Sequence, residues 1–267
     1  MDEARLPLRV MTFNIRYNNP NDGDNAWPYR KDLAGEMFRR HQPDVAGLQE
    51  ALAEQVEDLA ACLPDFAWVG VGREDGASEG EFAAVFYRTE RLTLLESGTF
   101  WLSETPETPG LGWDAHCVRT VTWVRFQDNV TGAPFVFLNT HFDHASKRAR
   151  HESALLLLER AQKLSGGLPV VVTGDLNCVP ISKTYRLLTR DHKDSDFRLF
   201  DAKSKSETLH HGPAATFHAF TGKLRARIDY IFVSAGVRVL RHVTLTDDWE
   251  GRYPSDHTPV VADVVMG

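Results

Sequence analysis

The chain has 267 residues, of which 42% are hydrophobic and 10% aromatic, enough to bury a substantial core. Its net charge of −7 and isoelectric point near 5.9 argue against a broad basic surface for long nucleic acid, but not against a small phosphorylated substrate in a local pocket. Three cysteines without a CxxC pair argue against both a disulfide framework and a zinc finger.

The beginning of the sequence lacks the basic start and long apolar stretch of a signal peptide, and no apolar run approaches membrane-spanning length. We therefore expect a cytoplasmic protein, with secretion of a trimmed chain left open. No repeat, low-complexity segment or interdomain linker interrupts the sequence, so we expect one domain over residues 1–267. Oligomeric state does not follow from the sequence, and a monomer is the default.

The first half of the chain predicts alternating strands and helices, followed by a run of strands. Strands are predicted at 8–15 and 45–48, helices at 31–41 and 51–63, and a turn-rich loop rich in Asn, Asp and Pro at 17–28. Further strands are predicted at 66–72, 82–88, 91–101, 118–127 and 134–140. A Thr/Pro/Gly-rich stretch over 103–112 is typical of a binding loop.

The second half predicts the longest helix, over 146–164, where apolar residues form one stripe that ends at Gly166-Gly167. Residues 168–172 read as a strand buried on both faces. A helix near 182–190 and a polar segment to about 213 come next. Strands are then predicted at 227–233, 237–245 and 257–265, so the chain is expected to be rich in strands interrupted by helices.

Polar residues stand at the ends of several apolar strands. A carboxylate and a carboxamide, Asp175 and Asn177, leave the strand at 168–172, where they either form an Asx turn or serve a site. Asp229 lies inside an apolar strand and needs a partner, for which His257 is a candidate. The other polar residues at strand ends are Asn14, Glu50, Asn139, His141 and Asp256.

Six segments in this order resemble the motifs of the endonuclease/exonuclease/phosphatase superfamily, the family of deoxyribonuclease I: MTFNIR, LQE, NTHFDH, GDLN, RIDYIF and SDHTPV. The resemblance spans positions 11 to 260. It implies a four-layer α/β/β/α sandwich with two packed mixed β-sheets and a site where strand ends of both sheets meet. Further segments resemble a bacterial branch of metal-dependent hydrolases.

The resemblance implies a phosphoesterase that uses Mg²⁺, with Mn²⁺ as a substitute, to cleave a phosphodiester or phosphomonoester. Glu50 would be the main metal ligand, with Asn14 and Asp256 completing the surroundings of the ion. Asp175 would activate the attacking water for in-line attack. The remaining catalytic residues would be Asn177, His141 and His257, which donate to phosphate oxygens, and Asp229, which orients His257.

Candidate substrate contacts come from the loops between these motifs. Arg16 stands where the apurinic endonucleases have an acidic residue, which weakens the case for a second metal and for DNA repair. Arg119 is interpreted as a plain strand residue, and 147–150 as a solvated start of the long helix. The remaining candidates are Trp27, Trp113, His218, Asp143 and His144.

Three alternatives remain open. One is a nuclease acting on DNA or RNA, and another is an inactive family member that serves as a binding module. The third is a dinuclear zinc hydrolase of the metallo-β-lactamase type, because NTHFDH is one histidine short of HxHxDH. Asn139 takes the place of that histidine and removes a metal ligand. We favour a small or short phosphoester as substrate.

Overall fold

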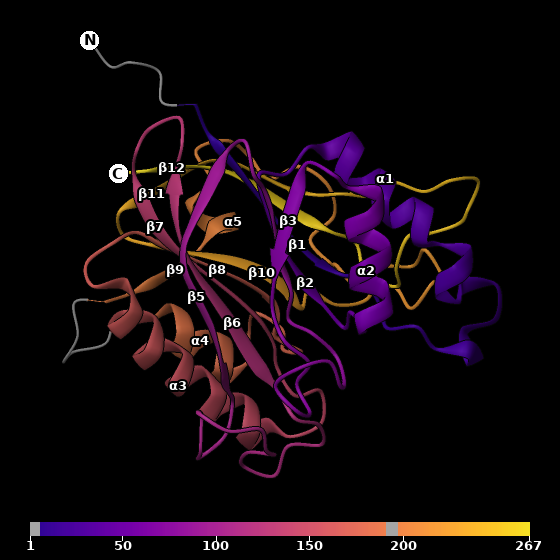
Figure 1. Cartoon of the computed structure of the whole chain (residues 1–267), viewed down its shortest axis with the longest axis horizontal. Helices are drawn as coiled ribbons and strands as arrows, with labels where there is room; N and C mark the ends of the chain where they lie inside the picture. Colours follow the sequence, from indigo (N-terminus) through magenta and orange to yellow (C-terminus); the bar gives the residue numbers. More distant parts are fainter. Residues whose placement is uncertain (1–5, 191–196) are drawn as a thin grey trace.

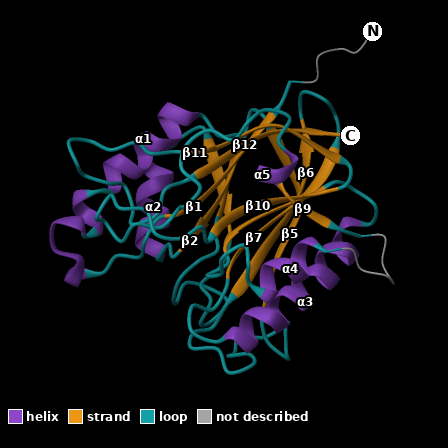
Figure 2. Cartoon of the chain, turned by 180° about the vertical axis from the view of Figure 1, so that it is seen from behind, coloured by secondary structure: helices purple, strands orange, loops and turns teal. Residues whose placement is uncertain are grey.

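The structure is a computed structural model that describes residues 6–190 and 197–267. Two six-stranded mixed sheets pack against each other, with strand orders β11-β12-β1-β2-β4-β3 and β5-β6-β7-β8-β10-β9. Helices α1 and α2 cover the outer face of the first sheet, whereas α3 and α4 cover the outer face of the second (Figure 1). The same four layers are seen from behind in Figure 2. This arrangement is the predicted α/β/β/α sandwich.

The first sheet contains one parallel pair, β1 with β2, and its other strand pairs are antiparallel. Its strands are β1 (Leu8–Asn14), β2 (Val45–Gln49), β3 (Phe66–Val69), β4 (Val85–Arg88), β11 (Val237–Thr244) and β12 (Val260–Met266). Its helices are α1 (Lys31–His41) and α2 (Ala53–Cys62), preceded by the short 3-10 helices η1 (Pro20–Asn25) and η2 (Trp27–Tyr29).

The second sheet also contains one parallel pair, β7 with β8. Its strands are β5 (Leu92–Trp101), β6 (Thr120–Asp128), β7 (Pro134–His141), β8 (Val170–Asp175), β9 (Leu199–Asp201) and β10 (Asp229–Ser234). Its helices are α3 (Lys147–Ser165), α4 (Lys183–Thr189) and the short α5 (Ala202–Lys205). No helix among residues 6–190 and 197–267 is long and apolar enough to cross a membrane.

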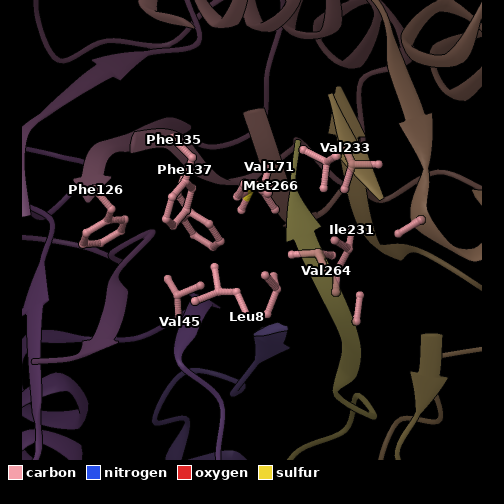
Figure 3. Packing of buried hydrophobic residues seen from close by; sticks show 14 of the residues in the cluster. Leu8, Val45, Phe126, Phe135, Phe137, Val171, Ile231, Val233, Val264 and Met266 are labelled. Atoms are coloured by element: carbon pink, nitrogen blue, oxygen red, sulfur yellow. The ribbon is translucent and has the colours of Figure 1, made fainter. Parts of the chain in front are cut away.

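The layer between the sheets is built by alternate residues of the central strands, since successive side chains of a strand point to opposite faces. Phe135 and Phe137 of β7 point into this layer, whereas Val136 and Leu138 point outward under α3. Figure 3 shows side chains of both sheets meeting there. Complete burial of each such side chain contributes about 2 kcal/mol to folding.

The inward-facing residues become polar toward one end of this layer. Asn139, two residues beyond Phe137, is fully buried and donates from Nδ2 to the carbonyl oxygens of Leu48 and Ala84 in the other sheet, at 2.7 and 3.0 Å. Its Oδ1 accepts hydrogen bonds from Gln49 Nε2 and Thr173 Oγ1, at 2.7 and 3.1 Å. Asn139 therefore joins the two sheets by hydrogen bonds.

Gly47 makes room for this junction. A Cβ atom built there would lie 2.4 Å from Asn139 Oδ1 and 2.2 Å from Thr173 Oγ1, closer than side chains can approach. The glycine in β2 thus lets the two sheets approach closely at the end of the core that carries the polar residues.

Several predicted elements are correct, and others differ at their ends. The strands predicted at 66–72, 82–88, 227–233 and 257–265 are shorter or shifted, because the first or last residues of each form isolated bridges or loops. The loop predicted over 17–28 contains η1 and the first two residues of η2. The segment predicted as polar to about 213 contains β9 and α5, and its residues 191–196 lie outside the described residues.

Candidate active site

The candidate site lies where the carboxyl ends of β1 and β2 in the first sheet meet those of β7 and β8 in the second. The register of the second sheet places His141 beside Asp175, and Asp175 beside Asp229, in one row across β7, β8 and β10. From the first sheet, β1 ends at Asn14, and Glu50 directly follows β2. Residues far apart in the chain are thus brought together by strand pairing and sheet packing.

Asn14 connects the carboxylates of the two sheets. Its Nδ2 donates to Glu50 Oε1 at 2.9 Å and to Asp175 Oδ2 at 3.1 Å, and its side chain is fully buried. Glu50 has a left-handed backbone (φ 63°), and its Oε2 accepts a hydrogen bond from the backbone N–H of Tyr17 at 3.2 Å. Both carboxylates therefore face the same small region.

Asp175 is held by the turn that follows β8. Its Oδ1 accepts the backbone N–H of Asn177 at 2.8 Å, and Asn177 adopts a left-handed conformation (φ 47°). The predicted Asx turn and the predicted site are thus the same structure. Burial, together with the carboxylate of Asp229, raises the pKa of Asp175 to about 7.

His257 is paired with Asp229, as the sequence predicted. Its Nδ1 lies 2.9 Å from Asp229 Oδ2, which also accepts a hydrogen bond from Thr216 Oγ1. The other ring nitrogen, Nε2, lies 3.8 Å from Asp175 Oδ2. Burial alone would lower the pKa of His257, but the carboxylates of Asp229 and its neighbours outweigh burial and raise the pKa to about 10.

His141 has the opposite character. Arg119 donates from Nη1 to His141 Nδ1 at 2.8 Å, which leaves the proton of the neutral ring on Nε2, 3.6 Å from Asp175 Oδ2. Burial, followed by the positive charge of Arg119, lowers the pKa of His141 well below its usual value. The site therefore combines a neutral histidine and a protonated histidine around one carboxylate.

Two residues at this end of the site were missed or misread in the sequence. Arg119 is not a plain strand residue, because it is buried and contacts His141. Glu81 Oε2 lies 3.7 Å from His141 Nδ1 and 3.5 Å from Arg119 Nη1. Glu81 lies in the segment Gly80-Glu81-Phe82, one of those that resemble the bacterial branch, and no sequence spacing links this segment to β7.

The carboxylates suit a divalent cation. One ligand atom from each of Glu50, His141 and Asp175 lies within 4.8 Å of the other two, and the same holds for Asp175, Asp229 and His257. Asp256 is buried nearby, and burial raises its pKa, while Glu50 adds to this shift. Carboxylates crowded in this way repel one another, and a hard cation with oxygen ligands relieves that repulsion.

The buried Oδ1 of Asp229 has no hydrogen-bond partner among the described residues. Among the described residues, this buried oxygen therefore keeps its lone pairs unused. The donor set and this unpaired oxygen together fit an oxygen-ligated ion.

The loops place some of the predicted substrate residues beside the site. Arg16 pairs with Asp22 at 2.9 Å and lies 3.8 Å from Glu50 Oε2. His144 is exposed, and its Nδ1 lies 3.4 Å from Arg119 Nη2. Both residues could face a ligand in this region.

Trp113 and His218 are more enclosed. Trp113 is half-buried, and its ring packs against the core under α3. His218 is buried, its ring centroid lies 4.7 Å from that of Tyr253, and its Nδ1 has no partner among the described residues. Burial, followed by the charge of His257, lowers the pKa of His218 to about 4.

Other candidates have structural positions. Trp27 is 2% exposed, packs in the core under α1 and α2, and donates from Nε1 to Asp58 at 2.8 Å, so its ring does not line the site. Asp143 accepts hydrogen bonds from four backbone N–H groups, which hold its loop and leave no oxygen free for substrate. Arg150, predicted to be solvated, is 9% exposed and donates to the backbone oxygen of Asp143.

The zinc-hydrolase alternative is not supported. It required the NTHFDH segment to supply several metal ligands at one place. Asn139 instead joins the two sheets, and Asp143 is occupied by backbone N–H groups. The fold is also the predicted sandwich, with the carboxylates of Glu50 and Asp175 at the junction of the sheets.

Comparison with known proteins agrees with this geometry. The model of the "Endonuclease/Exonuclease/phosphatase family" matches residues 11–257. A solved endonuclease/exonuclease/phosphatase from Bacteroides vulgatus is 40% identical, with a TM-score of 0.91 over 98% of this chain and 99% of that chain. A mannosyl-6-phosphatase from Bacteroides thetaiotaomicron is 36% identical, with a TM-score of 0.89 over 97% of this chain and 100% of that chain.

More distant relatives include Nocturnin of Drosophila melanogaster, which is 23% identical over 96% of this chain and 46% of its own length. The chain spans between 30% and 67% of the length of the curated proteins it matches. The lowest and the highest of these values belong to two proteins of Acanthamoeba polyphaga mimivirus. Members of the matched family are hydrolases of phosphoester bonds and generally depend on divalent metals. The fold, the convergent carboxylates and the family match lead to one conclusion: the chain belongs to the endonuclease/exonuclease/phosphatase family.

Proposed function

We propose that this protein is a Mg²⁺-dependent phosphoesterase that hydrolyses a small or short phosphorylated substrate, with residues 1–267 acting as one catalytic unit. The observation that carries the proposal is the placement of Asp175 between His141 Nε2 and His257 Nε2, at 3.6 and 3.8 Å. A base for the attacking water and two N–H donors for the phosphate oxygens thus lie together, and hydrolysis of a phosphate ester by water uses groups of these two kinds.

Asp175 accepts the proton of the attacking water. A pKa of about 7 matches the working pH, where a general base is most effective because it is both largely ionised and basic enough. The backbone N–H of Asn177 fixes Oδ1, and Asn14 Nδ2 fixes Oδ2, so the carboxylate is oriented before substrate binds. Water attacks phosphorus in line with the bond to the leaving oxygen.

His141, His257 and Asn177 donate hydrogen bonds to the phosphate oxygens as negative charge builds on them. The protonated ring of His257 supplies a full positive charge, while neutral His141 donates from Nε2. Preorganised donors of this kind typically contribute about 3 kcal/mol each to transition-state stabilisation. Asp229 keeps His257 protonated and oriented.

Glu50, Asn14 and Asp256 would hold the Mg²⁺ ion, and Mn²⁺ would substitute for it. When bound, the ion polarises a phosphate oxygen and neutralises charge in the transition state. Two observations support this assignment: Asn14 contacts Glu50, and the charge of Glu50 helps to raise the pKa of Asp256. Arg16, 3.8 Å from Glu50, would lie at the edge of the ion's surroundings.

Two features favour a small substrate over long nucleic acid. The net charge is −7, so the chain as a whole would repel a polyanion. The relative that is 36% identical and matches over its whole length is a mannosyl-6-phosphatase. A nuclease remains the second candidate, because the more distant relatives include 3'-5'-exoribonuclease subunits of 22% and 21% identity.

The decisive experiment measures hydrolysis of bis(p-nitrophenyl) phosphate, p-nitrophenyl phosphate and mannose 6-phosphate with Mg²⁺, Mn²⁺ or EDTA. Labelled single-stranded DNA and RNA are tested in parallel, and Glu50→Ala and His257→Ala serve as variants. We expect metal-dependent turnover of a small ester that both variants lose. Cleavage of nucleic acid alone would favour the nuclease, whereas metal-free turnover or unaffected variants would refute the proposed site. No turnover of any of these substrates would favour the binding module.

A further inference from the structure

A cavity of about 680 Å³ adjoins the candidate active site on the side of α3 and α4. Asn177 belongs to both, since it lines the cavity and its Nδ2 lies 3.0 Å from His141 Nε2. The two helices lie side by side over the second sheet (Figure 2). A substrate whose phosphate contacts Asn177 would therefore extend its remaining part into this cavity.

The charged residues that line the cavity are cationic. Lys147 and Arg150 come from the first turn of α3, and Lys183 begins α4. No Asp or Glu is present in the lining formed by the described residues. In a chain with 37 acidic and 30 basic residues, a wall with three cations and no acid departs from the average surface.

The strongest evidence for an anion site in this cavity is the position of Arg150. Its side chain is 9% exposed, and its Nη1 donates to a backbone oxygen, that of Asp143, at 2.7 Å. No ion pair joins Arg150 to a carboxylate within the part of the chain that the structure describes. A buried cation is costly unless an anion compensates it, so this position points to a negative charge brought by a ligand.

Apolar side chains occupy the rest of the wall. Ile181 is 77% exposed and Val179 is 38% exposed, although both are large and hydrophobic. Exposed apolar residues at the edge of a pocket are suited to contact a carbon skeleton. The cavity thus offers cations for an anionic group and apolar surface for the atoms that connect this group to the scissile phosphate.

From these observations we propose that the substrate carries a second anionic group, a phosphate or a carboxylate, which binds to Lys147, Arg150 and Lys183. This proposal rests on the proposed function, because it describes a group on the part of the substrate that remains after the phosphate ester bond is cleaved. Charge-assisted hydrogen bonds to the second anion would act mainly on substrate binding, so they would lower KM more than they change kcat.

The test compares phosphate monoesters of alkyl chains that end in a carboxylate, a phosphonate or a hydroxyl group, in a graded series of chain lengths. The carboxylate and phosphonate arms distinguish the two kinds of anion. We expect that one chain length shows kcat/KM about tenfold higher for an anionic end than for the hydroxyl end, mainly through KM. Equal values for all ends at every chain length would overturn the proposal.

The variant Lys147→Glu/Lys183→Glu should abolish this preference. Its turnover of p-nitrophenyl phosphate, which has no second anion, should stay within about twofold of the parent value, because exposed charges act weakly over distance in salt. The matched control is Lys163→Glu/Arg186→Glu, which reverses one exposed cation on α3 and one on α4 outside the cavity lining. A preference that persists in the first variant, or disappears in the control, contradicts the assignment.

Arg150→Gln tests the buried cation separately. Since this change also affects the hydrogen bond to Asp143, thermal unfolding is measured in parallel. A loss of the preference for anionic ends in a folded variant supports the proposal. An unchanged preference would mean that Arg150 only holds the loop at Asp143 and does not belong to the proposed site.

Failure of the proposed function can be separated from failure of this inference. If no ester is hydrolysed, the phosphoesterase assignment is wrong, and calorimetric titration of the same esters then measures binding directly. Tighter binding of the anionic ends, lost in Lys147→Glu/Lys183→Glu, would keep the cavity as an anion site. Equal binding of all ends would overturn the inference, whereas turnover of p-nitrophenyl phosphate tests the proposed function alone.

Discussion

The Nδ1 atom of His257 lies 2.9 Å from Oδ2 of Asp229, and both side chains are buried at the junction of the two sheets. Asp229 is fixed in turn by pairing with Asp175 across β8 and β10. The imidazole therefore keeps one orientation, with Nε2 directed toward the carboxylate that we propose as the base.

Asp229→Asn should reduce kcat by about a hundredfold or more, because the ring loses the carboxylate that orients it and stabilises its charge. In the parent, the pKa of His257 is raised to about 10, so the protonated ring persists through neutral pH. In the variant this pKa falls, and activity should decline as pH rises through the lower value. Profiles of kcat against pH, with NMR titration of His257, check this expectation.

Asp263→Asn is the matched control for this change. Asp263 pairs with Arg9 on β1 and lies outside the site, so its pH profile should match the parent. A profile of Asp229→Asn identical to that of the parent would contradict the proposed role.

Glu50→Gln should weaken Mn²⁺ and Mg²⁺ binding by about tenfold or more, since a neutral amide replaces the main anionic ligand. Calorimetric titration measures this directly, and EDTA should abolish turnover of the parent. Glu57→Gln removes an exposed carboxylate from α2 and should leave metal affinity unchanged. Equal affinities in Glu50→Gln and the parent would rule out Glu50 as a ligand.

Trp27→Phe should lower the free energy of unfolding by about 2 kcal/mol, because a buried ring shrinks and the hydrogen bond to Asp58 is lost. KM should remain at the parent value, since the indole packs in the core under α1 and α2. Chemical denaturation and steady-state kinetics test the two parts. A raised KM with unchanged stability would restore Trp27 as a substrate contact.

Acid should destabilise the protein through His242. Burial, followed by the charge of Arg227, lowers the pKa of His242 to about 3, whereas an unfolded histidine titrates near pH 6.5. The unfolded state thus binds the additional proton, and the free energy of unfolding falls as pH drops from about 6.5 toward about 3, by at most about 1.4 kcal/mol per pH unit.

His242→Phe should make this slope shallower, as measured by urea unfolding at a series of pH values. The exposed His211 provides the comparison, because His211→Gln should keep the slope of the parent. Parallel slopes for His242→Phe and the parent would show that His242 does not bind a proton on unfolding.

Asn139→Leu should cost about 3 kcal/mol or more, because it removes three buried hydrogen bonds between the sheets, those with the carbonyl oxygens of Leu48 and Ala84 and with the amide of Gln49. Asn129→Leu, at an exposed position, should cost far less. Denaturation midpoints measure both. A small effect of Asn139→Leu would mean that apolar packing alone holds the sheets together.

The sequence allowed part of the candidate site to be predicted, because polar residues at the end of an apolar strand, such as Asp175, or inside one, such as Asp229, are visible without a structure. Strand register places these two residues side by side, and a side-chain hydrogen bond joins His257 to Asp229. Their proposed roles stay predictions. The burial of Trp27 was not foreseen, because an aromatic residue in a polar loop has no periodicity that reveals its burial.

Contacts between distant segments were harder to foresee. Glu81 lies in the loop between β3 and β4, and Arg119 directly precedes β6, yet both side chains contact His141 at the end of β7. Neither residue follows an apolar run of the sequence. Arg150 looked solvated, because its neighbours at the start of α3 are charged, yet the turn at Asp143 draws it inward. These positions depend on tertiary packing, which local patterns do not encode.

The hydrogen bonds of Asn139 between the two sheets also bear on which parts of this protein can vary in sequence. Apolar layers alone would tolerate sliding, but directional bonds from one amide to both sheets lock their mutual alignment. The spacing between Asn14 at the end of β1 and Asp175 at the end of β8 is thereby fixed by the packing of the sheets and does not depend on a loop. The surrounding loops and outer helices can then vary in sequence while the residues of the candidate site keep their spacing.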